Sequence, residues 1–197
     1  MIAQAILFDL DGTLWHSRAW YEHVLVTHHG ASRELVVERL AKDCPPALLA
    51  FQLAIERSRL IRSCEESIAQ LVLYPGIMDT LEELAHRGTR MAAVTSEARD
   101  LAEMMLRGHR LRAYFETLVT PSRSIRAKPH PDSLNHALCE MGIAPARHIY
   151  YVGDKNTDAT AAAAAGLSFA WVEYGYGCER PESAGQVIQK FSDVLSL

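Results

Sequence analysis

The sequence predicts an α/β fold: a parallel sheet sandwiched between helices, with a small all-helical segment inserted after the first strand. Two observations predict it. From Gly76 to the C-terminus, short apolar runs alternate with amphipathic segments, which is typical of a sheet built from strand–helix–strand units. Between residues 14 and 72, apolar residues recur every three or four positions instead, and no strand candidate occurs there.

Length and composition agree with one core domain carrying a modest insertion. The chain has 197 residues, of which 49% are hydrophobic and 22% charged, as is ordinary for a globular protein. Its formal charge of −4 gives no electrostatic support for nucleic acid or an anionic membrane as a partner. No apolar run approaches the length of a membrane span.

The cysteines indicate the compartment. Cys44, Cys64, Cys139 and Cys178 lack metal-ligand or redox spacing, so reduced thiols are expected. The N-terminal residues lack the basic region of a signal peptide. A cytoplasmic protein is therefore predicted. Its oligomeric state cannot be inferred from the sequence.

The first strand ends in two acids. The apolar run Ile6–Phe8 leads into Asp9, Leu10, Asp11 and Gly12. Ligands of open parallel sheets bind at the carboxyl edge, so both carboxylates are expected to face a site there. Gly12 allows a sharp turn and a close approach of backbone N–H groups to an anion.

The helical insertion is assigned to residues 16–74, and the core domain to 1–15 and 75–197. Pro45 and Pro46 are expected to break one helix and start the next. Arg57, Arg59 and Arg62 are expected to share a solvated helix face. The helical segments are predicted around residues 18–28, 32–42, 46–62 and 65–71.

Three further segments follow apolar strands at the same predicted edge. Strand 90–94 ends at Thr95 and Ser96, whose hydroxyls could donate to a phosphate oxygen, although such a pair also commonly caps a helix. After a short strand at 117–120, Lys128 precedes Pro129 and Pro131 and is kept out of the next helix.

The strand at 148–152 leads into Gly153 and Asp154, and Asp158 follows about one turn into the next helix, facing the same pocket. A fifth strand is predicted at 168–172, and an amphipathic helix is predicted to close the chain.

These side chains together suggest a chemistry. Four carboxylates within a few ångströms repel by roughly 1–4 kcal/mol per close pair, so they need a cation. A set of oxygen ligands favours Mg²⁺ over Zn²⁺. A hydroxyl and an ammonium beside that cation suit a phosphate dianion, and the remaining carboxylates suit nucleophilic attack and proton transfer. Phosphoryl transfer through an aspartyl-phosphate uses all of these groups.

In order and in strand context, these motifs resemble those of the haloacid dehalogenase superfamily. More narrowly, the chain is similar to the branch of phosphoglycolate phosphatases and β-phosphoglucomutases, whose core is a Rossmann-like sheet and whose helical cap occupies the position of the insertion. The segments concerned are Asp9-Leu10-Asp11-Gly12-Thr13, Thr95, Lys128 and Gly153-Asp154-x-x-x-Asp158.

The resemblance implies a role for each residue. Asp9 would be the nucleophile and a Mg²⁺ ligand. Asp11 would be the general acid and base and would bind the metal through its carbonyl oxygen, and Asp154 would be a further ligand. Thr95, with Ser96, and Lys128 would hold the phosphate. Asp158 would support the site as a ligand through water or as a partner of Lys128.

The resemblance also defines the expected function. Dehalogenases of the superfamily lack the second aspartate, so Asp11 favours a phosphate ester. We expect a Mg²⁺-dependent phosphatase for a small phosphomonoester metabolite, similar to phosphoglycolate or a sugar phosphate. A sugar-phosphate mutase and a non-catalytic binding protein on the same fold are the alternatives. One departure is His16, where many members of this branch have aspartate, at the hinge into the cap.

Overall fold

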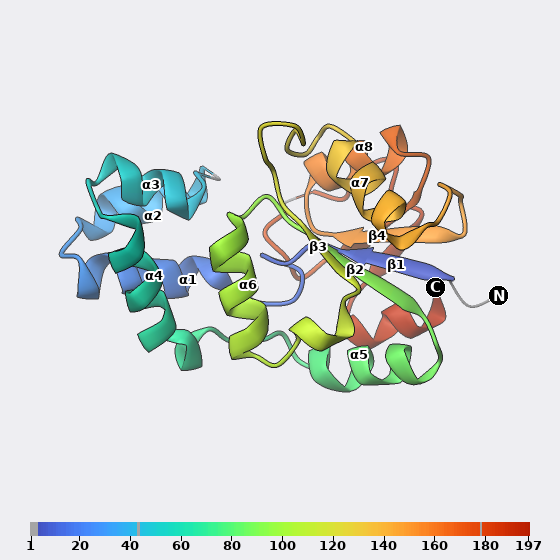
Figure 1. Cartoon of the computed structure of the whole chain (residues 1–197), viewed down its shortest axis with the longest axis horizontal. Coiled ribbons are helices and arrows are strands. Elements are labelled where there is room, and N and C mark those ends of the chain that lie inside the picture. The colour runs from blue at the N-terminus through green and yellow to red at the C-terminus, as the bar shows by residue number, and fades with distance from the viewer. Residues whose placement is uncertain (1–3, 43, 178) are drawn as a thin grey trace.

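A six-stranded parallel sheet forms the centre of the protein (Figure 1). The computed structural model describes residues 4–42, 44–177 and 179–197. The strand order is β3-β2-β1-β4-β5-β6, so β1 lies between β2 and β4. The strands are β1 (Ala5–Phe8), β2 (Arg90–Val94), β3 (Thr117–Val119), β4 (Ile149–Gly153), β5 (Ser168–Val172) and β6 (Gln186–Ile188).

Helices cover both faces of this sheet, as predicted. Alternate residues of β1 enter two apolar clusters, with Ile6 and Phe8 facing one and Ala5 and Leu7 the other. The first cluster includes α5 and η4, and the second includes α7 and α8, which lie on opposite sides of the sheet in Figure 1. The helices of the core are α5 (Ile77–His86), α6 (Arg99–Gly108), η3 (Arg112–Tyr114), α7 (Asp132–Met141), α8 (Asn156–Ala164) and η4 (Phe191–Ser196).

The chain between β1 and β2 begins with a group of helices that extends away from the sheet, at the left of Figure 1. Trp20 anchors the start of this group, because its indole N–H donates to the buried carbonyl of Ser67 at 2.8 Å. Arg57 of the group forms an ion pair with Asp100 of α6. The group consists of α1 (Ser17–His23), the π-helical turn η1 (Val24–His28), α2 (Arg33–Ala41), α3 (Pro46–Gln52), α4 (Arg57–Glu66) and η2 (Ile68–Gln70).

Two predicted elements were wrong. The single helix at 46–62 is two helices, because Ala54 adopts φ 54 and ends the first of them. The terminal amphipathic helix is the short strand β6 followed by the 3₁₀ turns of η4. Ile188, Phe191 and Val194 have helical spacing in the sequence, but Ile188 pairs with Val172 of β5 as part of a sixth strand that was not predicted.

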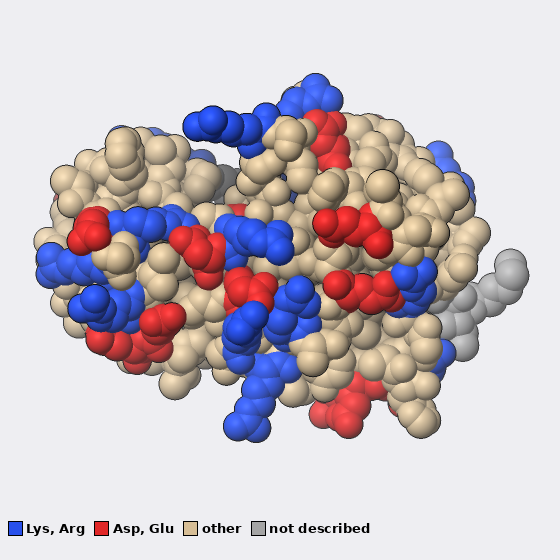
Figure 2. All heavy atoms as spheres, in the orientation of Figure 1, with Lys and Arg blue, Asp and Glu red and all other residues tan. Residues whose placement is uncertain are grey.

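The cysteines, the lengths of the helices and the surface charges were also considered in the sequence. Cys44, Cys64 and Cys139 are free thiols, and Cys178 lies outside the described residues. No helix of the described ranges is long and apolar enough to cross a bilayer. Figure 2 shows basic and acidic side chains interspersed on one face of the molecule. Arg59 and Arg62 are exposed, whereas Arg57 is half-buried in its ion pair.

Packing between α6 and η2 allows a test of the fold. A Cβ added at Gly108 would overlap Cγ1 of Ile68. Replacing a helical glycine with alanine usually stabilises a protein by about 0.5–1 kcal/mol. Because of the overlap, Gly108→Ala is expected to lower the free energy of unfolding by about 1–3 kcal/mol in urea titrations. In an Ile68→Ala background the same change should be neutral or stabilising, and an unchanged loss there would contradict the packing.

Candidate active site

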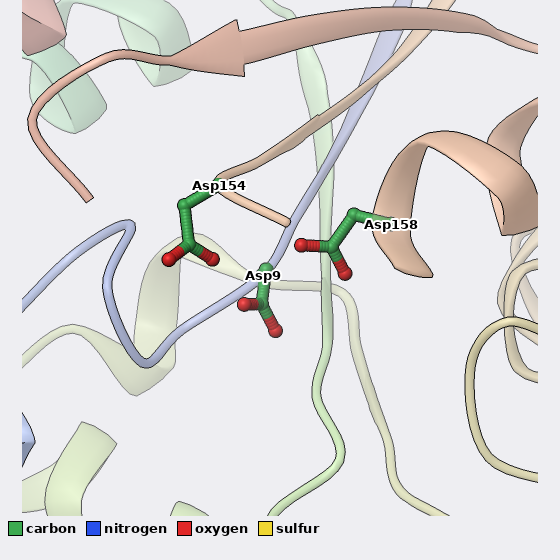
Figure 3. Close-up of side chains that lie close together, drawn as sticks. All are labelled: Asp9, Asp154 and Asp158. Atoms are coloured by element: carbon green, nitrogen blue, oxygen red, sulfur yellow. The ribbon is translucent and has the colours of Figure 1, made fainter. Parts of the chain in front are cut away.

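Three aspartates meet at the carboxyl edge of the sheet (Figure 3). Asp9 directly follows β1, Asp154 directly follows β4, and Asp158 lies in the first turn of α8. One carboxylate oxygen from each lies within 4.8 Å of the other two, and all three side chains are buried. Since β1 and β4 are neighbours in register, residues after both strands are brought to one point.

Lys128 lies in the middle of this group. Its ammonium is 2.7 Å from Oδ1 of Asp9 and 2.7 Å from Oδ1 of Asp158, and it donates to the hydroxyl of Tyr151 at 2.9 Å. Burial opposes the charge of the lysine, but the two carboxylates hold its pKa well above its ordinary value. The ammonium therefore stays charged and ties the loop before α7 to β1 and α8.

The aspartates differ in what remains available for a ligand. Both oxygens of Asp158 are used, one by Lys128 and the other by the backbone N–H of Lys155 at 3.0 Å. Oδ2 of Asp154 accepts from the N–H of Tyr176 at 2.6 Å, whereas its Oδ1 is buried without a hydrogen-bond partner. Asp9 accepts only from Lys128 among the described residues, through Oδ1. One oxygen each of Asp9 and Asp154 is thus open to a cation.

Burial makes ionisation of these acids costly. It raises the pKa of Asp9 to about 8, although Lys128 opposes the shift, and Asp158 and Asp154 add to it. Burial and the nearby Asp158 raise the pKa of Asp154 to about 6. A divalent cation would favour the ionised form of both groups, because it would supply the positive charge that Lys128 alone does not.

Glycines let the backbone approach the acids. Gly12 has φ 85, and a Cβ there would overlap Oδ2 of Asp154 and lie 2.8 Å from Cδ2 of Tyr176. A Cβ at Gly153 would lie 2.7 Å from Oδ2 of Asp158. Both positions require glycine for the acids to remain where they are.

Asp11 lies apart from the other acids. Its Oδ1 accepts from the indole N–H of Trp15 at 2.9 Å, and the residue lines the cleft above the three buried aspartates. The expected convergence of four carboxylates is met by only three, because Asp11 is not part of the group within 4.8 Å and its carboxylate accepts from Trp15 instead. The loop geometry explains this difference: β1 ends at Phe8, so the two-residue alternation of a strand no longer applies at Asp11.

Thr95 and Ser96 follow the neighbouring strand β2 into the same cleft. Thr95 is buried, and its hydroxyl oxygen accepts from the N–H of Glu97 at 3.1 Å, so the hydroxyl hydrogen remains able to donate. Ser96 is exposed and lines the cleft.

The cleft has a volume of about 610 Å³ and runs between the sheet edge and the inserted helices. Ser17, Arg18 and Tyr21 of α1 line it, together with Tyr176. The guanidinium carbon of Arg18 lies 4.1 Å from the centroid of the Tyr176 ring. His16 contacts Tyr74 and Tyr176 edge to face, with ring centroids 6.4 and 5.3 Å apart.

Sequence reasoning missed several of these groups. Trp15, Tyr151, Tyr176 and Glu97 each touch a predicted site residue, yet the expected motifs do not contain them. For Trp15 the indication available in the sequence was its position four residues after Asp11 in the same loop. Tyr176 follows the fifth strand and lies between glycines, which could have marked a loop returning to the edge.

Comparison with known proteins identifies the family of this chain. Residues 6–172 match the family of haloacid dehalogenase-like hydrolases. The chain belongs to that family. The phosphoglycolate phosphatase of Pseudomonas fluorescens is 34% identical, over 91% of this chain and 73% of that protein. Pyrophosphatase PpaX of Bacillus pumilus is 29% identical, over 98% of this chain and 94% of the PpaX chain.

A solved structure shares the fold. CbbY from Rhodobacter sphaeroides, crystallised with phosphate, superimposes with a TM-score of 0.79 over 100% of both chains at 23% identity. The family and the parallel α/β fold inferred from the sequence are therefore confirmed.

The raised pKa values predict how stability depends on pH. In the unfolded chain Asp9 and Asp154 titrate near their ordinary values, so between about pH 4 and 8 the folded protein holds protons that the unfolded chain has lost. Stability without metal should therefore fall as pH rises through this range, by at most roughly 1.4 kcal/mol per unit for each group. His29 and His109, whose pKa values are lowered by burial, act in the opposite direction.

The difference between wild type and Asp9→Asn isolates the contribution of Asp9. In EDTA, urea unfolding at pH 5.5, 6.5 and 7.5 should show the wild type losing stability relative to the variant as pH rises. A constant difference between the two would contradict the raised pKa.

Proposed function

We propose that the protein is a Mg²⁺-dependent phosphatase that hydrolyses a small phosphomonoester through an aspartyl-phosphate on Asp9. The observation that supports this most is the buried group of Asp9, Asp154 and Asp158 around Lys128, with one oxygen each of Asp9 and Asp154 left open. Family membership agrees with the proposal, as does the name of the relative from Pectobacterium atrosepticum, a phosphoglycolate phosphatase.

Mg²⁺ fits the donor set. The unpartnered Oδ1 of Asp154 and the second oxygen of Asp9 are the two open donors, and the carbonyl oxygen of Asp11 would be a third. When bound, Mg²⁺ would neutralise the acids and draw charge from the phosphate oxygens. Asp158, with both oxygens already bonded, acts as the partner of Lys128 in this scheme.

The first half of the reaction forms the intermediate. The carboxylate oxygen of Asp9 that does not hold Mg²⁺ attacks phosphorus, and the bond from phosphorus to the leaving oxygen breaks. Asp11 gives its proton to that oxygen, and the alcohol departs. Lys128 and the hydroxyl of Thr95 hold phosphate oxygens as charge develops on them.

The second half restores the enzyme. Asp11, now a carboxylate, takes a proton from a water molecule as that water attacks phosphorus. The bond between phosphorus and Asp9 breaks, inorganic phosphate leaves, and Asp9 is again a carboxylate. The indole of Trp15 keeps the Asp11 carboxylate in the cleft in both halves.

The role of the nucleophile can be tested directly. Phosphate release from a panel of small phosphomonoesters and sugar phosphates should require Mg²⁺ and stop in EDTA. Asp9→Asn should lose at least roughly a thousandfold in kcat, which is about 4 kcal/mol of barrier. The matched control is Asp79→Asn on the exposed side of α5, which should leave kcat unchanged.

Near-normal turnover in Asp9→Asn would show that another group is the nucleophile. Conversion of a sugar phosphate to an isomer without net phosphate release would favour the mutase instead. If Asp9→Asn bound phosphate esters normally and the wild type turned over none of them, a binding protein would be the better assignment.

The metal site has its own test. Asp154→Asn removes one of the two open carboxylates but can keep the hydrogen bond from the Tyr176 N–H. The Mg²⁺ concentration that gives half-maximal activity should rise at least about tenfold, because a neutral amide is a weaker ligand than a carboxylate. An unchanged Mg²⁺ requirement would exclude Asp154 as a ligand.

A further inference from the structure

A buried acid outside the proposed catalytic set lines the cleft. Glu97 lies two residues after Thr95, in the loop that follows β2, and is only 4% exposed. Its Oε1 accepts from the N–H of Ala98 at 2.7 Å, and its Oε2 accepts from the hydroxyl of Tyr21 at 2.8 Å. Tyr21 belongs to α1, so the acid joins the sheet edge to the inserted helices.

The charge of Glu97 is only partly compensated among the described residues: its two hydrogen-bond donors are neutral, and the effect of the nearby Arg57 on its pKa is smaller than that of burial. The carboxylate forms no ion pair with any residue of the described ranges 4–42, 44–177 and 179–197, and Arg57 pairs with Asp100 instead. Burial and the nearby Asp11 raise the pKa of Glu97 to about 7. An unpaired buried acid is costly for the fold, so its position in a cleft wall indicates a ligand that compensates it.

The position of Glu97 relative to the proposed phosphate site indicates which part of a substrate Glu97 would contact. The hydroxyl of Thr95 is the group expected to hold phosphate, and its oxygen is 3.1 Å from the N–H of Glu97. Asp11, the proposed donor to the leaving oxygen, is near enough to disfavour ionisation of Glu97. The acid therefore lies on the side of the cleft from which the alcohol departs.

We propose that Glu97, held by Tyr21, selects the leaving group of the substrate: it accepts a hydrogen bond from a hydroxyl or ammonium group and disfavours a leaving group that carries a second anion. This inference rests on the proposed phosphatase function. The substrate class is thus a phosphate ester of an amino alcohol or polyol. It differs from phosphorylated acids, including the phosphoglycolate after which several relatives are named, and from bisphosphates. An anion placed next to the buried carboxylate of Glu97 would be repelled by it, which gives the selection its basis.

Three esters with one two-carbon skeleton isolate the effect. In 2-aminoethyl, 2-hydroxyethyl and carboxymethyl phosphate, the far group is an ammonium, a hydroxyl and a carboxylate. With Mg²⁺ at pH 8, above the raised pKa of Glu97, the first two should exceed carboxymethyl phosphate at least about tenfold in kcat/KM. The same order should appear when they inhibit turnover of 4-nitrophenyl phosphate, which requires no variant.

Glu97→Gln keeps the shape of the side chain and removes its charge. We expect the preference for aminoethyl over carboxymethyl phosphate to fall at least about tenfold, with the gain for the anionic ester appearing mainly in KM. Glu82→Gln makes the same chemical change at an exposed position of α5 and should leave the preference unchanged.

The outcomes separate the two proposals. If 4-nitrophenyl phosphate is hydrolysed but the wild type prefers carboxymethyl phosphate, the proposed selection by Glu97 is wrong. The proposed phosphatase function would still hold. Equal effects of Glu97→Gln on all three esters would show a merely structural role and also overturn the selection. If no ester is hydrolysed with Mg²⁺, both proposals fail together.

Discussion

The contact of Lys128 with Asp9 and Asp158 is the interaction on which the site depends. Three carboxylates with oxygens within 4.8 Å of one another could not remain buried without positive charge, and the ammonium lies 2.7 Å from two of them. One ammonium does not balance three acids. Burial and the neighbouring carboxylates raise the pKa of Asp9 and Asp154, and a divalent cation would favour the ionised form of both.

The topology of the sheet explains why these groups meet. The order β2-β1-β4 places three consecutive carboxyl ends side by side, so Thr95, Asp9 and Asp154 need only be the residues that follow each strand. Lys128 arrives by a separate loop and is fixed by Tyr151 of β4, whose hydroxyl also donates to the carbonyl of Val94. A rigid strand thereby sets the position of a side chain that comes from irregular backbone.

The predictable part of the site was the part that depends on strands. Asp9, Thr95 and Asp154 could be placed because an apolar run fixes where a parallel strand ends. The contacts of Lys128 with Tyr151 and of Tyr21 with Glu97 could not be, because they join residues 23 and 76 positions apart through a loop and an inserted helix. Trp15 lies only four residues from Asp11, but the turn that brings the two together is irregular backbone. The wrong prediction of a C-terminal helix arose because a local pattern was relied on. There, apolar residues with helical spacing serve a short strand and a 3₁₀ turn, so local periodicity was overridden by pairing with β5.

The negative charges of the two groups of acids in the cleft are balanced in different ways, which suggests that the two groups bind different parts of a substrate. Asp9, Asp154 and Asp158 surround a lysine and leave two oxygens for a cation, so they are suited to the phosphate end of a substrate. Glu97 has only neutral donors, and one of them is a tyrosine from α1. The sheet edge can thus keep the phosphoryl chemistry constant while α1 and Glu97 determine which alcohol is accepted. Specificity could then change within this fold through residues facing α1, without disturbing the carboxylates at the ends of β1 and β4.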